Sequence, residues 1–351
     1  MRALRWHGRG DIRLEEIPRP PEPGAGHVQL RTLWCGICGT DIEEWLHGPI
    51  FIPEASPNPL TGGQAPLVLG HEVTGEIVAI GEGVSGLTVG DLVAVDGLMS
   101  CGTCHWCRRE RPVLCPHLSA IGLMCDGGLA DFCNVPARGC VRLPAGLPAD
   151  EGALAETLAV GVRALRRGRI ADGDAIAVFG AGAVGLLAAQ AAVARGASSV
   201  TVVDPIAERR ELAAMLNDGD IMHVITPDEV SLLHDIDLAL ECSGTPRALE
   251  SALQCLRPGG RVVLVGISAS PVVMATTDLV IREKEIIGSL SHVYNEDFTE
   301  AVAMLGDGSV KAGPLVSSRR PLGEALEAFQ SAADEPHAYV KILISPSEVH
   351  S

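Results

Sequence analysis

The chain has 351 residues, of which 47% are hydrophobic, and its formal net charge is −17. This length predicts two domains, because a single hydrophobic core stops growing at about 250–300 residues, and the hydrophobic content excludes an intrinsically disordered chain. The acidic balance argues against nucleic acid and anionic membranes as partners, so a small-molecule substrate is expected. The N-terminus has no apolar secretory segment, and several of the eleven cysteines are spaced as metal ligands, which indicates the cytoplasm.

The first 150 residues are rich in glycine and proline and contain short β-branched runs. Three of these runs, Val28–Leu33, Glu76–Ile80 and Leu92–Val95, are bounded by turn residues and are typical of strands. The pattern predicts an irregular, mostly-β first domain.

Within this region, four cysteines follow one another as C-x-x-C-x-x-C-x(7)-C; they are Cys101, Cys104, Cys107 and Cys115. That spacing can place four thiolates around one tetrahedral Zn²⁺. The segment 101–115 has little apolar periodicity, so without metal it has no core of its own. Because protein sulfur would fill all four positions, we expect this zinc to be structural.

From about Asp150, Ala- and Leu-rich helical segments alternate with compact apolar strands. The expected strands are Ala175–Phe179, Val200–Val203, Asp237–Glu241 and Arg261–Val265. This alternation predicts a parallel, doubly wound α/β sheet. The uncharged run 175–194 is long enough to span a bilayer, but its three glycines favour a buried strand followed by a helix.

The strand at 175–179 runs directly into a G-x-G-x-x-G motif formed by Gly180, Gly182 and Gly185, with Val184 inside it. In a strand–turn–helix context this motif predicts dinucleotide binding. Gly180 permits the turn, Gly182 lets the backbone approach a pyrophosphate, and Gly185 allows close helix packing. A glycine-rich turn in another buried βα unit is the alternative.

Asp204 strengthens the dinucleotide interpretation. It stands nineteen residues after Gly185 and ends the next apolar strand, where a carboxylate accepts hydrogen bonds from a ribose 2′-hydroxyl and repels a 2′-phosphate. NAD is therefore favoured over NADP, although Arg209 and Arg210 leave the strictness of this preference open.

After about Gly288 the alternation ends, and amphipathic segments follow at 297–310 and 322–332. We expect them to be helices that pack back on the first domain. The predicted division is a first domain at 1–157, a dinucleotide-binding domain at 158–290, and a C-terminal segment at 291–351 that returns to the first domain.

Motifs along the whole chain resemble the zinc-dependent medium-chain alcohol and polyol dehydrogenases. The family's order is kept by "GICGTD", "GHEVTGEIVAIGEGVSGLTVGD", the four-cysteine segment, "AETLAVGVRAL" and the dinucleotide motif. The resemblance implies a GroES-like catalytic domain and a Rossmann domain. The stretch from "WCGICGTD" to "APLVLGHE" is most similar to butanediol dehydrogenases, in the sorbitol dehydrogenase-like branch.

Carried over to this sequence, the family's catalytic zinc ligands are Cys38, His71 and Glu156, and Glu72 is a carboxylate close to the metal. The resemblance thus implies two zinc ions per chain, one catalytic and one structural. Three protein ligands leave one position for the substrate oxygen, so the metal stabilises an alkoxide that releases hydride to the nicotinamide.

The resemblance also implies a proton path. Thr40 matches the hydroxyl that takes the substrate proton, and Asp41 matches a carboxylate that orients the ligating histidine. Many relatives end the path at a histidine where this chain has Glu43; that carboxylate, the cofactor ribose and His47 are the alternatives. Segments that line the nicotinamide in the family include Cys242, Val265 and Ile267 here.

The expected activity is NAD-dependent interconversion of a secondary alcohol, a vicinal diol or an α-hydroxyketone with its ketone. A polyol, sugar or amino-alcohol dehydrogenase of a biosynthetic pathway is one alternative. A dinucleotide-binding protein without turnover is an alternative of another class. The family likeness further implies a homodimer or homotetramer.

Overall fold

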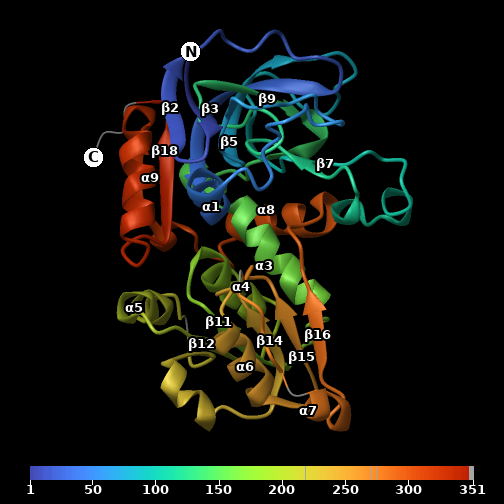
Figure 1. The fold of residues 1–351 in the computed structure, drawn as a ribbon, viewed down its shortest axis with the longest axis vertical. Coiled ribbons are helices and arrows are strands. Elements are labelled where there is room, and N and C mark those ends of the chain that lie inside the picture. The colour runs from blue at the N-terminus through green and yellow to red at the C-terminus, as the bar shows by residue number, and fades with distance from the viewer. Residues whose placement is uncertain (218, 269, 275, 348–351) are drawn as a thin grey trace. The chain divides into compact units, whose positions relative to one another are not determined.

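The chain forms two compact units in the computed structural model, which describes residues 1–217, 219–268, 270–274 and 276–347 (Figure 1). Unit 1 comprises residues 1–156 together with the chain from Val316 onward, and unit 2 comprises residues 157–315. The first boundary lies one residue before the predicted one. The chain returns to unit 1 at Val316, later than the predicted return at 291.

Unit 1 consists mainly of antiparallel β-structure, as the composition predicted. Its strands are β1 (Arg2–Gly8), β2 (Asp11–Glu16), β3 (His27–Ile37), β4 (Leu67–Val68), β5 (Glu72–Ile80), β6 (Leu92–Val95), β7 (Leu98–Met99), β8 (Ser119–Ala120), β9 (Phe132–Pro136), β10 (Cys140–Arg142), β17 (Val316–Pro321) and β18 (Lys341–Ser345). Its helices include α1 (Gly39–His47), α2 (Ala149–Gly152) and α9 (Ala325–Asp334).

The largest sheet of unit 1 has the order β10-β6-β5-β3-β18-β17, with β9 also paired to β3. Strands β5 and β18 both pair antiparallel with β3, so that Gly36 lies opposite Glu72 on one side and Leu343 on the other. Buried apolar side chains of the sheet and of α9, such as Val28 and Phe329, form one core cluster. The end of β3 therefore meets the starts of β5 and β18, which places residues there close together.

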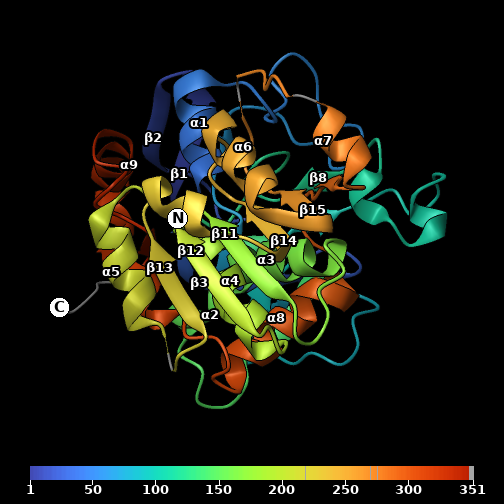
Figure 2. The same ribbon diagram turned by 90° about the horizontal axis from the view of Figure 1, so that it is seen from below.

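Unit 2 is a doubly wound α/β domain, as predicted (Figure 2). Its parallel strands are β11 (Ala175–Phe179), β12 (Ser199–Val203), β13 (Met222–Ile225), β14 (Ile236–Glu241), β15 (Leu256–Leu264) and β16 (Glu285–Gly288). Its helices include α3 (Ala155–Arg167, which begins in unit 1), α4 (Ala183–Ala194), α5 (Ala207–Met215), α6 (Pro246–Cys255), α7 (Thr276–Ile281) and α8 (Thr299–Gly306). The strand order β13-β12-β11-β14-β15-β16 reverses between β11 and β14, and such sheets bind ligands at that point.

Helices cover both faces of this sheet, with α6 on one side and α3 and α4 on the other in Figure 2. Ala177 and Phe179 of β11 belong to the same core cluster as Leu249 of α6. Val178 between them faces the opposite side, where its side chain lies next to Gly185 of α4. The uncharged run 175–194 is therefore a buried strand and helix, and among the described residues no helix is long and apolar enough to cross a membrane.

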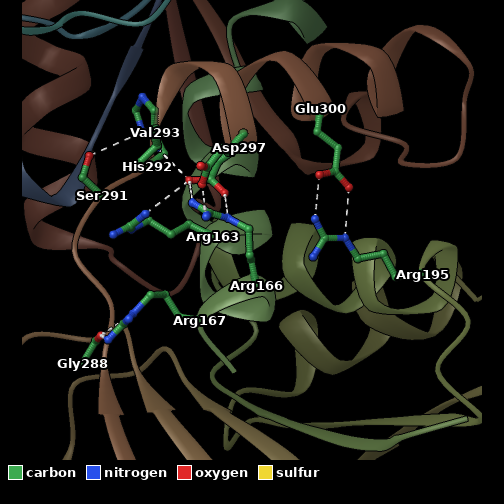
Figure 3. A network of polar contacts seen from close by, with 11 residues as sticks. Arg163, Arg166, Arg167, Arg195, Gly288, Ser291, His292, Val293, Asp297 and Glu300 are labelled. Carbon is green, nitrogen blue, oxygen red and sulfur yellow. Dashed lines mark hydrogen bonds and ion pairs between the residues drawn. The ribbon is translucent and has the colours of Figure 1, made fainter. Parts of the chain in front are cut away.

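Ion pairs attach the segment 291–315 to unit 2 (Figure 3). Arg166 of α3 binds both oxygens of Asp297, at 2.8 and 2.9 Å, and Asp297 is fully buried in a π-helical turn, Tyr294–Phe298. Arg195, directly after α4, binds Glu300 of α8 at 3.0 and 2.6 Å. The acidic groups in and before α8 thus pair with arginines of the dinucleotide domain, and segment 291–315 belongs to that domain. The boundary therefore lies at 315/316 and not at the predicted 290/291. The second amphipathic segment contains α9 and belongs to unit 1, as predicted.

Candidate functional site

The four cysteines of segment 101–115 form one cluster. The sulfur atoms of four cysteines all lie within 4.8 Å of one another; these are Cys101, Cys104, Cys107 and Cys115. The sulfur of Cys107 is 3.5 Å from that of Cys104 and 3.9 Å from that of Cys101. These separations are close to the ~3.8 Å expected between sulfurs that each lie about 2.3 Å from a tetrahedral zinc. The donor chemistry and spacing fit a zinc ion with no position left for a substrate.

Two thiols of this cluster differ strongly in acidity. Backbone amides of Thr103 and Cys104 lower the pKa of Cys101 to about 6, whereas burial raises the pKa of Cys115 to about 11. Because zinc binds thiolates, metal binding here should release the protons that the four thiols carry.

A second cluster lies where β3 and β5 meet. Cys38 directly follows β3, His71 directly precedes β5, and Glu72 is the first residue of β5. One ligand atom from each of these residues lies within 4.8 Å of the others. A thiolate, an imidazole and a carboxylate are donors that zinc prefers. The structure thus brings two predicted ligands, Cys38 and His71, together with the carboxylate that was expected near the metal.

Asp41 lies beside both predicted ligands. Its Oδ2 accepts a hydrogen bond from the backbone N–H of Cys38 at 2.9 Å, and its Oδ1 lies 3.5 Å from Nδ1 of His71. Burial disfavours the protonated imidazole, but the charges of Asp41 and Cys38 outweigh this and raise the pKa of His71 well above its usual value. A carboxylate against one ring nitrogen leaves the other nitrogen for a metal. Asp41 therefore lies beside the predicted histidine ligand, and its role in orienting that ligand stays a prediction.

Glu156, the predicted third ligand, does not join the cluster of ligand atoms that the described residues form. It is partly exposed in the first turn of α3. Burial disfavours the charged form of Lys341, but nearby acidic groups, Glu72 first and Glu156 among them, outweigh this and raise the pKa of Lys341. Glu156 therefore lies close enough to act electrostatically on the site.

Sequence reasoning missed Lys341. It is the first residue of β18, its side chain is 4% exposed, and its Nζ donates to both oxygens of Glu72 at 2.5 and 2.8 Å. The sequence feature that could have indicated a buried lysine is its place at the start of the apolar strand "KILIS". A thiol, an imidazole and a carboxylate thus lie together beside this ammonium, and such donors can bind a divalent cation.

Thr40, Glu43 and His47 follow one another along α1 at helical spacing. Oγ1 of Thr40 lies 3.7 Å from the sulfur of Cys38. The side chains of Glu43 and His47 are 61% and 66% exposed, and their nearest oxygen and nitrogen are 3.9 Å apart. Residues three and four apart share a helix face, so these side chains form a polar line from the metal cluster to solvent.

The glycine motif has the local geometry that its prediction requires. Gly180 adopts φ +103°, a region that side chains rarely enter. A Cβ at Gly185 would lie 1.9 Å from the carbonyl oxygen of Gly180, whereas a Cβ at Gly182 would meet nothing within 4 Å. Helix α4 begins after Gly182, with Val184 in its first turn. Gly185 is thus needed for packing, and Gly182 leaves open space at the helix N-terminus, where a phosphate can bind.

Asp204 holds the glycine loop. Its side chain is buried, and its two oxygens accept backbone N–H groups of Ala181 at 2.7 Å and Ile206 at 2.8 Å. A carboxylate can accept about four hydrogen bonds, so capacity remains for a ribose hydroxyl. Arg210 donates to the backbone oxygen of Asp204 at 2.8 Å, and Arg209 is half-buried.

A pocket of about 170 Å³ lies beside Asp204, at the carboxyl ends of the parallel strands. Its wall is partly apolar and partly polar; the lining includes Phe179, Val203, Pro205, Pro227, Val230, Ser243, Thr245 and Arg247. Such a lining suits a planar ring with polar groups at its rim. Most of these residues were missed from the sequence, although Phe179 and Val203 end predicted strands and Pro205 closely follows one. Pro227 and Val230 follow β13, a strand that was not predicted.

The remaining predicted cofactor residues follow β14 and β15. Cys242 donates its backbone N–H to Phe179 at 2.8 Å, and burial raises the pKa of its thiol. Val265 donates its backbone N–H to Glu241 at 2.9 Å, and Ile267 is 83% exposed. All three lie at the ligand-binding edge of the sheet, and their contacts with a cofactor stay predictions.

Comparisons with known proteins cover both units. Residues 24–145 match the alcohol dehydrogenase GroES-like domain, and residues 183–307 match the zinc-binding dehydrogenase domain. The (R,R)-butanediol dehydrogenase of Bacillus subtilis is 34% identical over 354 residues, which are 99% of this chain and 100% of that protein. The crystal structure of 2R,3R-butanediol dehydrogenase from Bacillus subtilis has a TM-score of 0.90 at 33% identity, over 99% of both chains.

Two further proteins extend the likeness. Sorbitol dehydrogenase of Bos taurus is 33% identical over 361 residues, which are 99% of this chain and 97% of that protein. A structure described as a zinc-binding dehydrogenase from Sinorhizobium meliloti, bound to NADP, has a TM-score of 0.87 at 28% identity, over 98% of this chain and 99% of the other.

Proposed function

The chain belongs to the zinc-dependent medium-chain alcohol dehydrogenases, in the branch of the butanediol and sorbitol dehydrogenases, and we propose that it interconverts a secondary alcohol and its ketone with NAD. The proposed substrate class is a vicinal diol or the matching α-hydroxyketone, because the similarity to butanediol dehydrogenase extends over the whole chain. The cluster of Cys38, His71 and Glu72 carries the proposal, since it places zinc donors beside the hydroxyl of Thr40.

We propose two zinc ions per chain. The four-cysteine cluster at 101–115 would hold the structural ion. Cys38 and His71 would hold the catalytic ion, with Glu156 as the third protein ligand by resemblance to the family. When bound, the zinc would act as a Lewis acid on the substrate oxygen and the dinucleotide would accept the hydride.

The residues of α1 are proposed to carry the substrate proton to solvent. Thr40 would accept this proton at Oγ1, because its hydroxyl lies beside the sulfur of Cys38. Glu43 and His47 would then pass it to water, since both side chains are exposed and adjacent on the helix. Asp41 would hold His71 in the orientation needed for binding.

The proposed dinucleotide site lies in unit 2. Gly182 and the start of α4 would bind the pyrophosphate, and Asp204 would accept the ribose hydroxyls. The apolar wall formed by Val203 and Pro227 would contact the adenine ring. A buried carboxylate repels a 2′-phosphate, which is why we propose NAD although a similar structure contains NADP.

Turnover assays test this proposal. Purified protein would be incubated with NAD and a panel containing 2,3-butanediol stereoisomers, sorbitol, an amino alcohol and a primary alcohol, and formation of NADH would be measured. The proposal predicts the highest kcat/KM for a vicinal diol, and no turnover in a folded Cys38→Ser variant that still binds NAD. Preference for sorbitol would favour the polyol alternative, and absence of turnover with NAD binding intact would favour the non-catalytic alternative.

A further inference from the structure

The loop 289–292 follows β16 at the carboxyl edge of the sheet in unit 2. The backbone N–H of Ser289 donates to the carbonyl oxygen of Leu264, the last residue of β15, at 3.0 Å. Strand β14 pairs parallel with β15, so the ends of β14, β15 and β16 lie next to one another. Asp204, the proposed ribose ligand, follows β12 on the other side of the reversal between β11 and β14. A dinucleotide that crosses this reversal therefore has its nicotinamide half at the ends of β14, β15 and β16.

Two features of this loop are typical of a ligand-binding segment. The Oγ of Ser289 is buried and has no hydrogen-bond partner among the residues that the structure describes. Buried polar groups of native proteins are normally hydrogen-bonded, so this hydroxyl is available to a bound molecule. Ser291 adopts φ +49°, a region that residues other than glycine rarely enter. Such a backbone conformation persists only where its surroundings hold it, and it is common at ligand-binding sites.

Arginines of α3 anchor both ends of the loop (Figure 3). Arg167 donates from Nε and Nη2 to the carbonyl oxygen of Gly288, directly before the loop, at 3.3 and 3.2 Å. Arg166 donates to both oxygens of Asp297 at 2.8 and 2.9 Å. Oδ2 of Asp297 also accepts the backbone N–H of Val293, directly after the loop, at 2.7 Å. The two arginines thus fix the points at which the chain enters and leaves the loop.

The anchor after the loop is buried. Nη1 of Arg163 lies 3.5 Å from Oδ2 of Asp297, and these side chains are 8% and 0% exposed. His292 is 1% exposed, and its ring stacks on that of Phe298 with the centroids 5.6 Å apart. Leu290, between the two anchors, is 51% exposed. Because the hydrophobic core does not hold the middle of the loop, the arginine contacts at its ends determine its conformation.

We propose that Arg163, Arg166 and Arg167 are positioning residues, which hold the loop 289–292 in the conformation that receives the nicotinamide half of the dinucleotide. The inference rests on the proposed function, in which unit 2 binds NAD. A loop that is fixed before binding does not have to be ordered when the dinucleotide binds. If it occupied the competent conformation for only about a tenth of the time, the apparent affinity would fall about tenfold. The arginines act through the loop, since their contacts are with Gly288 and Asp297.

Binding of NADH and of ADP-ribose by an Arg167→Met variant tests this. ADP-ribose has the adenosine and pyrophosphate parts of the dinucleotide but no nicotinamide ring, so it does not need the loop. In calorimetric titrations the variant should bind NADH about tenfold more weakly than the wild type does, as expected if the competent population falls to about a tenth, and ADP-ribose with unchanged affinity. Without dinucleotide, hydrogen exchange at residues 289–292 should be faster in the variant. Equal weakening of both ligands, or no change in either, would overturn the proposal.

Arg169→Met is the matched control. Arg169 follows α3 by two residues and pairs with Glu285 at the other end of β16, so its replacement should change neither the two affinities nor exchange in the loop. Arg166→Met removes the anchor after the loop and should repeat the selective loss of NADH affinity. Because Arg166→Met also weakens unit 2, thermal unfolding would establish that it is folded at the assay temperature. If it is not, Arg167→Met, at a partly exposed residue, decides alone.

Two results separate this inference from the proposed function. If the wild-type protein binds neither NADH nor ADP-ribose, the proposed function itself fails. If the wild type binds both, but Arg167→Met keeps the wild-type NADH affinity and the wild-type exchange in the loop, the role of the arginines fails and the proposed function stands.

Discussion

Replacement of Asp204 by alanine should weaken unit 2 itself as well as its binding of dinucleotide. Asp204 is 2% exposed, and its carboxylate accepts hydrogen bonds from the backbone N–H groups of Ala181 and Ile206 at 2.7 and 2.8 Å. A hydrogen bond to a charged group contributes about 1.5–3 kcal/mol. Water that enters the space left by the side chain would recover part of the two bonds, so we expect a loss of about 3 kcal/mol, which lowers Tm by roughly 6–12 °C for a domain of this size.

Two measurements check this prediction. Thermal unfolding without dinucleotide measures the change in Tm, and titrations with NAD and NADP measure the change in affinity for each dinucleotide. Asp220→Ala, at an exposed aspartate of the same unit, is the matched control and should stay within about 0.5 kcal/mol of the wild type. An unchanged Tm for Asp204→Ala would refute the claim that this carboxylate holds the glycine loop. Unchanged affinity for both dinucleotides would remove Asp204 from the ribose site.

Other substitutions in unit 2 have separable effects. Gly185→Ala would place a Cβ 1.9 Å from the oxygen of Gly180, so both Tm and NAD affinity should fall. In Gly182→Ala the added methyl group would lie in open space, so NAD affinity should fall while Tm stays unchanged. Calorimetry and titration would measure these two quantities. If both glycine variants changed Tm and NAD affinity equally, the roles assigned to the two glycines would be contradicted. Arg166→Ala should lower the free energy of unfolding by about 2 kcal/mol, as measured by denaturant unfolding. A broken buried ion pair typically costs ~3–5 kcal/mol, but the side chain of Arg166 is 37% exposed although Asp297 is buried, so the expected loss is smaller. No measurable loss would mean that this pair does not hold the segment 291–315.

Features encoded by local sequence were predictable. The strand at 175–179 and the glycine motif after it were found because apolar runs and glycine spacing report directly on the backbone. The four-cysteine cluster was found for the same reason, since its ligands lie within one short segment. Membership of the family was likewise confirmed, because its motifs occur along the whole chain.

Features that depend on distant pairing were not predictable. An amphipathic pattern shows that one face of a helix is buried, but not against what, so the place of α8 became clear only from the pairs of Asp297 and Glu300 with arginines far away in the sequence. The Lys341–Glu72 pair joins residues 269 positions apart, and no spacing rule reports such a contact. The diol substrate, the homodimer or homotetramer and the cytoplasmic location stay predictions.

Zinc content per chain tests the central claim most directly. After exhaustive dialysis the wild-type protein should retain two zinc ions per chain and Cys38→Ser one, while Cys104→Ser should lose the other ion and unfold at lower temperature. This is the result expected if one ion is held at the meeting point of β3 and β5 and another by the four cysteines. A wild-type protein with one zinc ion, unchanged in Cys38→Ser, would contradict a catalytic metal at Cys38 and His71.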